Sequence, residues 1–202
     1  MIKLENVCKK FEDKVILTDF NMTIDTGEFV VFAGKSGCGK TTVLNMLGGI
    51  EPFDSGSITI NGNDITKKKF LRNYYLNEVG FLFQNFALVE NKTVRNNIEM
   101  VQKRARSRYS IEEALEKVGM LKDIDTEVYK LSGGEQQRVA LARLIFKKCN
   151  IILADEPTGS LDGENAKKVL DILDGLNKEG KTIILVSHDE KIISSGRRVV
   201  EL

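Results

Sequence analysis

Residues 34–41 have the residue types and spacing of a phosphate-binding loop. They read GKSGCGKT and fit the pattern G-x-x-x-x-G-K-[ST]. Glycines let backbone N–H groups turn inward and approach phosphate oxygens closely. In such a loop Lys40 reaches the terminal phosphates, and the hydroxyl of Thr41 binds Mg²⁺. The predicted phosphate site comprises Gly34, Lys35, Ser36, Gly37, Cys38, Gly39, Lys40, Thr41 and Thr42.

A second chemical group lies at residues 151–156, which read IILADE. An apolar run of this kind predicts a buried strand whose carboxyl edge carries Asp155, and ligands bind at that edge in open α/β sheets. Asp155 is therefore a candidate to orient Mg²⁺ or its waters, and Glu156 is a candidate to activate an attacking water. Such a pair is often only the end of a strand that meets solvent. The phosphate loop in the same chain favours the catalytic interpretation.

Strands and helices must position both groups, and the apolar pattern predicts an α/β chain. An apolar strand precedes the phosphate loop and a helix follows it, which disfavours a merely flexible glycine loop. Strands are predicted at residues 2–7, 15–24, 29–33, 57–60, 151–154 and 182–186. Helical spacing is present at residues 41–47, 94–118 and 164–176.

The composition excludes several classes of protein. The 202 residues carry 30 Lys+Arg against 29 Asp+Glu, and this balance argues against a histone-like nucleic-acid binder. A single histidine excludes a His-rich zinc centre. No apolar stretch approaches the roughly 20 residues of a membrane span, and no signal peptide is visible. Three widely spaced cysteines favour a reducing compartment.

Two basic clusters stand apart from the motifs, at residues 67–69 and 103–108. The simpler interpretation is a solvated helix face in each case. The alternative is contact with a membrane surface or an acidic partner.

Residues 131–138 read LSGGEQQR and identify a family. This segment resembles the signature motif of ATP-binding-cassette (ABC) ATPases, which other phosphate-loop enzymes lack. Ser132, Gly133 and Gly134 would begin a helix, whose serine hydroxyl and free N–H groups form another anion site, and Glu135 completes the motif. In isolation the segment would be an ordinary N-capped helix. Its position about 20 residues before Asp155 makes that interpretation weak.

The resemblance implies roles for four further residues. Gln84 matches the glutamine that contacts Mg²⁺ and links to a membrane partner, although a lone glutamine is otherwise a surface amide. Asp162 matches the D-loop, which touches the opposite subunit. His188, the only histidine, matches the switch histidine at the γ-phosphate. Phe11 stands where many relatives stack a tyrosine on adenine, and its alternative is an ordinary core residue.

The resemblance covers nearly the whole chain, and it implies the fold and the assembly. We expect one domain over residues 1–202: a P-loop (RecA-like) α/β core, an N-terminal antiparallel β region and a helical subdomain inserted at about residues 86–145. ATP and Mg²⁺ would be held between Lys40 of one chain and the signature segment of a second, in a head-to-tail homodimer. Lys40, Glu156 and His188 would carry catalysis.

The resemblance also implies a partner, because an ATPase of this family powers a separate membrane permease. The expected location is the cytoplasmic face of the membrane, with no nucleic-acid partner. Residues 83–94 look most like the macrolide-export, lipoprotein-release and bacteriocin-export branch. The alternative is a signalling module of the cell-division type. A soluble translation or repair ATPase is disfavoured by the single cassette, and a non-catalytic scaffold is disfavoured by the complete catalytic set.

One residue departs from the common family pattern. Cys38 stands inside the phosphate loop where serine is common. Its thiol would lie among inward-pointing N–H groups, which favour thiolate. We therefore expect thiol alkylation to inhibit hydrolysis and bound nucleotide to protect.

Overall fold

The computed structural model describes all of residues 1–202, and two sheets carry its architecture. The first sheet is antiparallel, with strand order β2-β1-β4-β5. Its strands are β1 (Ile2–Phe11), β2 (Lys14–Ile24), β4 (Ser55–Ile60) and β5 (Asn63–Asp64). The second sheet has five parallel strands in the order β6-β7-β8-β3-β9. They are β3 (Phe29–Ala33), β6 (Val79–Leu82), β7 (Ile151–Asp155), β8 (Thr182–Val186) and β9 (Arg198–Glu201).

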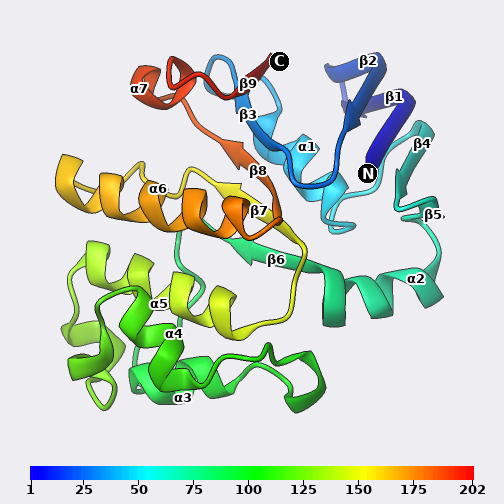
Figure 1. Ribbon diagram of the computed structural model, residues 1–202. Coiled ribbons are helices and arrows are strands. Elements are labelled where there is room, and N and C mark those ends of the chain that lie inside the picture. Colours follow the sequence, from blue (N-terminus) through cyan, green and yellow to red (C-terminus); the bar gives the residue numbers. More distant parts are fainter.

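The central parallel strands are buried on both faces. Every residue of β3 and of β8 is buried, as expected for a parallel sheet covered on each side. Phe29 and Val31 of β3 pack into a core shared with α5 (Gly133–Phe146) and α6 (Gly163–Lys178). The alternate residues Val30 and Phe32 pack against α1 (Lys40–Leu47) and the antiparallel sheet. The β3 strand therefore contributes to two cores, and it lies between β8 and β9 in the parallel sheet (Figure 1).

The remaining helices form two groups. In one group α2 (Lys68–Asn73) leads into a π-helical turn, Tyr74–Glu78, which ends at β6. In the other group α3 (Val94–Glu99) and α4 (Ile111–Lys117) precede α5, and all three lie between β6 and β7 in the chain. Figure 1 shows this green group at the end of the molecule away from β1 and β2. The shorter helices are α7 (Glu190–Ile193) and the 3₁₀ turns Lys103–Ala105, Leu121–Asp123 and Val128–Lys130. No helix is long and apolar enough to span a membrane.

The structure extends or corrects several predicted elements. The β1 strand continues to Phe11, four residues past the predicted end, because the register shifts after Leu4 and Val7 break the alternating pattern. The helix α2 was not predicted, and neither was the π-helical turn after it. Burial of Tyr74, whose hydroxyl donates to the carbonyl of Leu47 at 3.0 Å, anchors this region to α1 and raises the pKa of the phenol.

The basic cluster at residues 103–108 is not a helix face. Only Lys103–Ala105 form a 3₁₀ turn, and the chain beyond them is irregular. The Arg106 guanidinium lies 5.2 Å from the Phe146 ring centroid and donates to the carbonyl of Val101 at 3.1 Å. Arg106 is therefore a packing residue, whereas Lys103, Arg104 and Arg108 are exposed. The other cluster, Lys67–Lys69, is exposed at the start of α2 as expected.

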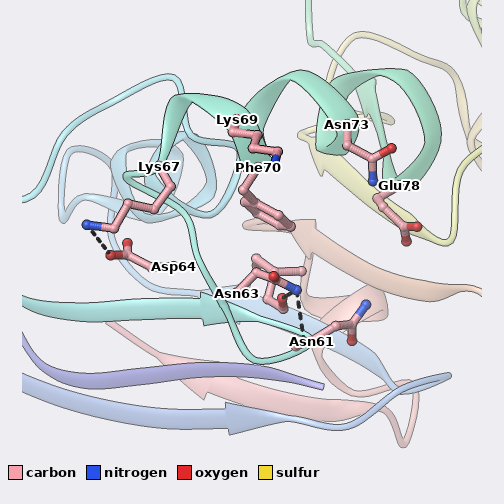
Figure 2. A pocket seen from close by; sticks show the side chains of 9 residues that line it. Asn61, Asn63, Asp64, Lys67, Lys69, Phe70, Asn73 and Glu78 are labelled. Atoms are coloured by element: carbon pink, nitrogen blue, oxygen red, sulfur yellow. Dashed lines mark hydrogen bonds and ion pairs between the residues drawn. The ribbon is translucent and has the colours of Figure 1, made fainter.

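A polar hollow of about 550 Å³ lies between β5 and α2 (Figure 2). Lys67 pairs with Asp64 at its rim, 3.3 Å apart, and the Asn63 amide donates to the carbonyl of Asn61 at 3.1 Å. Phe70 is the one aromatic side chain in its wall. No residue of the predicted phosphate loop or acidic pair lines this hollow, so the candidate chemistry lies elsewhere.

Candidate nucleotide-binding and catalytic site

Many of the predicted residues meet in a cleft of about 470 Å³. The end of β1, the start of β2, the phosphate loop with α1, the segment after β6 and the segment after β7 all contribute to it. Its lining residues are Phe11, Lys14, Ile16, Ser36, Gly37, Gly39, Lys40, Thr41, Thr42, Gln84 and Glu156. Segments more than 100 residues apart in sequence therefore converge at the carboxyl ends of the parallel strands, as open α/β sheets require.

The phosphate loop has a backbone that only glycine adopts readily. Gly34, Gly37 and Gly39 have φ values of +143°, +77° and +110°. A Cβ at Gly34 would lie 2.7 Å from the carbonyl oxygen of Leu202, and a Cβ at Gly39 would collide with Ile16. The loop is therefore a close-fitting cradle at the start of α1, whose backbone N–H groups suit phosphate.

Lys40 holds a buried positive charge inside this cradle. Its side chain is 6% exposed, and its ammonium donates to the carbonyls of Gly34 and Lys35 at 2.8 and 2.9 Å. Cys38 is half-buried, with its sulfur 3.8 Å from the same ammonium. A buried cation beside free N–H groups is a site for a polyanion.

The oxygen ligands that a hard cation prefers adjoin the loop. The Thr41 hydroxyl donates to an Asp155 carboxylate oxygen at 3.0 Å. Burial raises the pKa of Asp155, and the Thr41 hydrogen bond opposes that shift. Gln84 lines the same cleft. Hydroxyl, carboxylate and amide oxygens beside a phosphate site fit Mg²⁺, so Thr41, Asp155 and Gln84 are suited to hold it.

Glu156 and His188 form a pair at the ends of the neighbouring strands β7 and β8. The Glu156 carboxylate lies 3.0 Å from the His188 Nδ1. Glu156 has a φ of +43°, in the left-handed region, and its N–H donates to the carbonyl of Val186 at 3.0 Å. This backbone turn aims its carboxylate into the cleft, which it lines. The arrangement suits a carboxylate that accepts a proton from water and an imidazole that orients it.

The signature segment begins a helix, as predicted, but it lies outside the cleft of its own chain. Ser132 is the N-cap of α5. The Glu135 carboxylate accepts from both the N–H and the hydroxyl of Ser132, each at 2.8 Å. These hydrogen bonds lower the pKa of Glu135. The Ser132 hydroxyl is therefore held within the chain and is not simply free.

Asp162, the predicted D-loop residue, is the N-cap of α6. Its carboxylate accepts from the backbone and the side-chain amide of Asn165 at 2.9 and 2.7 Å. The backbone hydrogen bond is the main cause that lowers the pKa of Asp162.

Three residues to which the sequence assigned no role of their own join these elements. The fully buried Gln137 of α5 donates to the carbonyl of Pro157, directly after Glu156, at 2.8 Å. Arg138 donates to the Asn165 side chain. A Cβ at Gly134 would lie 2.9 Å from Asn165, so the two helices approach closely here. Only the capping distance between Asp162 and Asn165 was a usable sequence signal.

Phe11 lies at the cleft and not in the core. It is 43% exposed and lines the cleft at the end of β1. The ammonium of Lys9 lies 4.3 Å from its ring centroid. Lys14, also unpredicted, donates to the carbonyl of Gly37 at 2.6 Å.

Comparisons with known proteins agree with this geometry. The sequence model of the family described as "ABC transporter" matches residues 17–159. The macrolide export ATP-binding/permease protein MacB of Campylobacter jejuni is 36% identical over 215 residues; the match covers 100% of this chain and 33% of that protein. The chain thus spans about a third of the length of such relatives. The cell division ATP-binding protein FtsE of Mycobacterium tuberculosis is 38% identical, and the match covers 100% of this chain and 92% of that protein.

Solved structures are similar over the whole chain. A dimeric post-hydrolysis structure of the ATP-binding cassette MJ0796, bound to ADP and Pi, superposes with a TM-score of 0.87 and 33% identity. It covers 100% of this chain and 94% of that one. A second dimeric structure of MJ0796 gives the same TM-score at 36% identity.

Proposed function

Because this chain belongs to the ABC transporter family, whose ATP-binding cassettes hydrolyse ATP, we propose that it powers a separate membrane permease by closing and opening a dimer on ATP. One observation carries the proposal. The cleft holds the phosphate loop with Glu156, while Ser132 and its helix start lie outside it. One chain thus has two halves of an ATP site that do not meet.

A second copy supplies the missing half. In a two-fold, head-to-tail dimer, residues 132–135 of each chain face the phosphate loop of the other, and two complete sites form. The phosphates of ATP then neutralise positive sites on both chains and hold the sandwich together. The dimeric structures of MJ0796 support this arrangement.

Within each site the residues have distinct tasks. The loop N–H groups and Lys40 bind the β- and γ-phosphates, and Phe11 stacks on adenine. Thr41, Asp155 and Gln84 hold Mg²⁺, which when bound offsets the negative charge of the phosphates. Glu156 takes a proton from the attacking water, and His188 orients Glu156 and supports the charge that develops on the γ-phosphate. Hydrolysis weakens the contacts that the two chains share through the ATP phosphates, and the dimer opens.

The permease is a separate membrane protein that places this chain on the cytoplasmic face. Relatives named as macrolide or syringafactin export proteins favour export of a peptide, lipid or drug-like substrate. Co-purification with one membrane protein, and stimulation of hydrolysis by it, would support this part of the proposal.

A second function has its own supporting observation. FtsE of Mycobacterium tuberculosis is 38% identical, and the chain covers 92% of its length. A signalling module of this type would use the same ATP cycle to move a permease-like partner without a transported substrate. Reconstitution with the partner separates the two, because only a transporter moves a compound across the vesicle in an ATP-dependent way.

The Glu156→Gln variant tests the ATP cycle directly. We expect it to bind ATP with wild-type affinity and to lose about 100-fold or more in turnover, because the amide accepts no proton from water. Size-exclusion chromatography with ATP should show a dimer that ADP does not support. Wild-type turnover, or a monomer in saturating ATP, would overturn the mechanism.

A further inference from the structure

Lys9 is a buried lysine that the ATP cycle described above does not use. It is 5% exposed, although lysine is almost never buried without a partner. Its ammonium pairs with the Glu51 carboxylate at 2.6 Å and donates to the carbonyl of Pro52 at 2.8 Å. These contacts fix the ammonium in one place.

The contacts of Lys9 join two parts of the nucleotide cleft. Glu51 follows α1, and its N–H donates to the carbonyl of Asn45 on that helix at 3.2 Å. Lys9 itself lies on β1, two residues before Phe11. The ion pair thus ties the end of the phosphate-loop helix to the strand that presents the aromatic ring.

The Lys9 ammonium also touches the ring directly. It lies 4.3 Å from the Phe11 centroid, a distance at which a cation is attracted to the negative face of the ring. Phe11 remains 43% exposed and lines the cleft. One face of the ring is therefore backed by a fixed cation while the ring still borders the cleft.

We propose that Lys9 is a positioning residue for the adenine base. The cation holds the Phe11 ring in one orientation and draws electron density toward itself, which lowers the repulsion between the ring and an electron-rich purine on its other face. Glu51 keeps the cation in place. This inference rests on the proposed role of Phe11 as the adenine platform.

The inference predicts a loss of affinity that depends on adenine. We expect Lys9→Met to weaken ATP binding by about three- to tenfold, because the Phe11 ring is then neither held in one orientation nor polarised toward a cation. Binding of inorganic triphosphate, which has no base, should stay at its wild-type value. Lys10→Met is the matched control, because Lys10 neighbours Lys9 but is exposed. Isothermal titration calorimetry with ATP and with triphosphate measures both quantities, and Lys9→Arg should restore most of the ATP affinity.

A double-mutant cycle with Phe11→Ala separates the possible failures. If Lys9 acts through the ring, Lys9→Met has no further effect on ATP affinity once Phe11 is alanine. Equal losses for ATP and triphosphate, or additive losses in the cycle, would overturn the role of Lys9. No loss of ATP affinity in Phe11→Ala alone would instead overturn the assignment of the adenine platform.

A second variant keeps the test valid if Lys9→Met does not fold. Glu51→Gln keeps the lysine and its hydrogen bond to the carbonyl of Pro52, but it removes the carboxylate charge that holds the ammonium. We expect it to weaken ATP binding about twofold or more while triphosphate binding is unchanged. Unchanged ATP affinity in this variant would count against the proposal.

Discussion

Two helix N-termini in this chain are built for phosphate in different ways. At the start of α1 no side chain caps the helix, no acidic residue lies in the first turn, and the buried Lys40 adds a positive charge. At the start of α5 Ser132 and Glu135 form a complete capping box, so a carboxylate already occupies part of the anion site.

In the proposed dimer, this difference explains why the α1 site binds ATP within one chain and why the α5 site binds a phosphate only together with the α1 site of a second chain. The helix dipole and the unpaired N–H groups of the first turn attract an anion at the N-terminus of each helix. At α5 the Glu135 carboxylate offsets part of that attraction. The α1 site can therefore bind a triphosphate within one chain. In the proposed dimer, the α5 site is the weaker of the two and contributes when a second chain presents a phosphate that is already bound.

The largest effect should come from removing the cation of the α1 site. Lys40→Ala is expected to weaken ATP binding by about 100-fold, because a charge-assisted hydrogen bond to phosphate is lost from a buried position. Equilibrium titration of the monomer with ATP measures the loss. Lys68→Ala, on the exposed start of α2, is the charge-matched control. Affinity within twofold of wild type would show that the loop N–H groups suffice.

Alkylation of Cys38 should block the α1 site, because the added group occupies space that the phosphates need. Cys38 is half-buried beside Lys40, so an added group displaces the phosphates, and we expect hydrolysis to fall by about tenfold or more. Saturating nucleotide should slow the inactivation. Cys8 and Cys149 are the internal controls. The idea fails if Cys38→Ser is inactivated as readily as the wild type.

Changing the α5 site should affect turnover and spare binding by the monomer. Ser132→Ala removes the cap and the hydroxyl, and we expect turnover to fall several-fold while ATP affinity of the monomer is unchanged. The same variant should lower the free energy of unfolding by about 1 kcal/mol, measured by urea denaturation. Parallel losses in monomer affinity and turnover would mean that the two termini do not differ as described.

The smallest effect is a pH dependence of stability at the α5 site. The pKa of Glu135 is lowered in the folded chain, so its stabilisation is present above the unfolded pKa and is lost as pH falls through the folded value. Because the group is near the surface, the contribution is below about 1 kcal/mol. In the Glu135→Gln variant, the urea concentration at the unfolding midpoint should depend less on pH between pH 6 and about pH 3 than it does in the wild type. An unchanged slope would show that the capping box adds no charge-dependent stability.

The sequence predicted best the features that local patterns determine. The phosphate loop, Asp155 and Glu156 were identifiable because each motif follows an apolar strand whose carboxyl end must face the ligand. The convergence of Phe11 and Gln84 on the same cleft came from the family resemblance, and the structure places both at its wall.

Features that depend on packing between distant segments were not predicted. The buried state of Lys9 depends on Glu51, 42 residues away. Tyr74 is buried in a core formed by distant segments, and the carbonyl of Leu47 accepts a hydrogen bond from its hydroxyl. Asn165 and Gln137 have ordinary helical surroundings in sequence, and only the approach of α5 to α6 gives them partners. Apart from the capping distance between Asp162 and Asn165, no spacing along the chain carries such information.

The contacts of Gln137 and Arg138 also form a route by which one ATP site of the proposed dimer can influence the other. Both residues lie within two turns of Ser132 and hold the segment from Pro157 to Asn165, which follows Glu156. Two hydrogen bonds of these types amount to about 2–4 kcal/mol. In the proposed dimer these two hydrogen bonds can contribute about 30- to 1,000-fold to coupling between the ATP sites, and reciprocity makes that contribution equal in both directions.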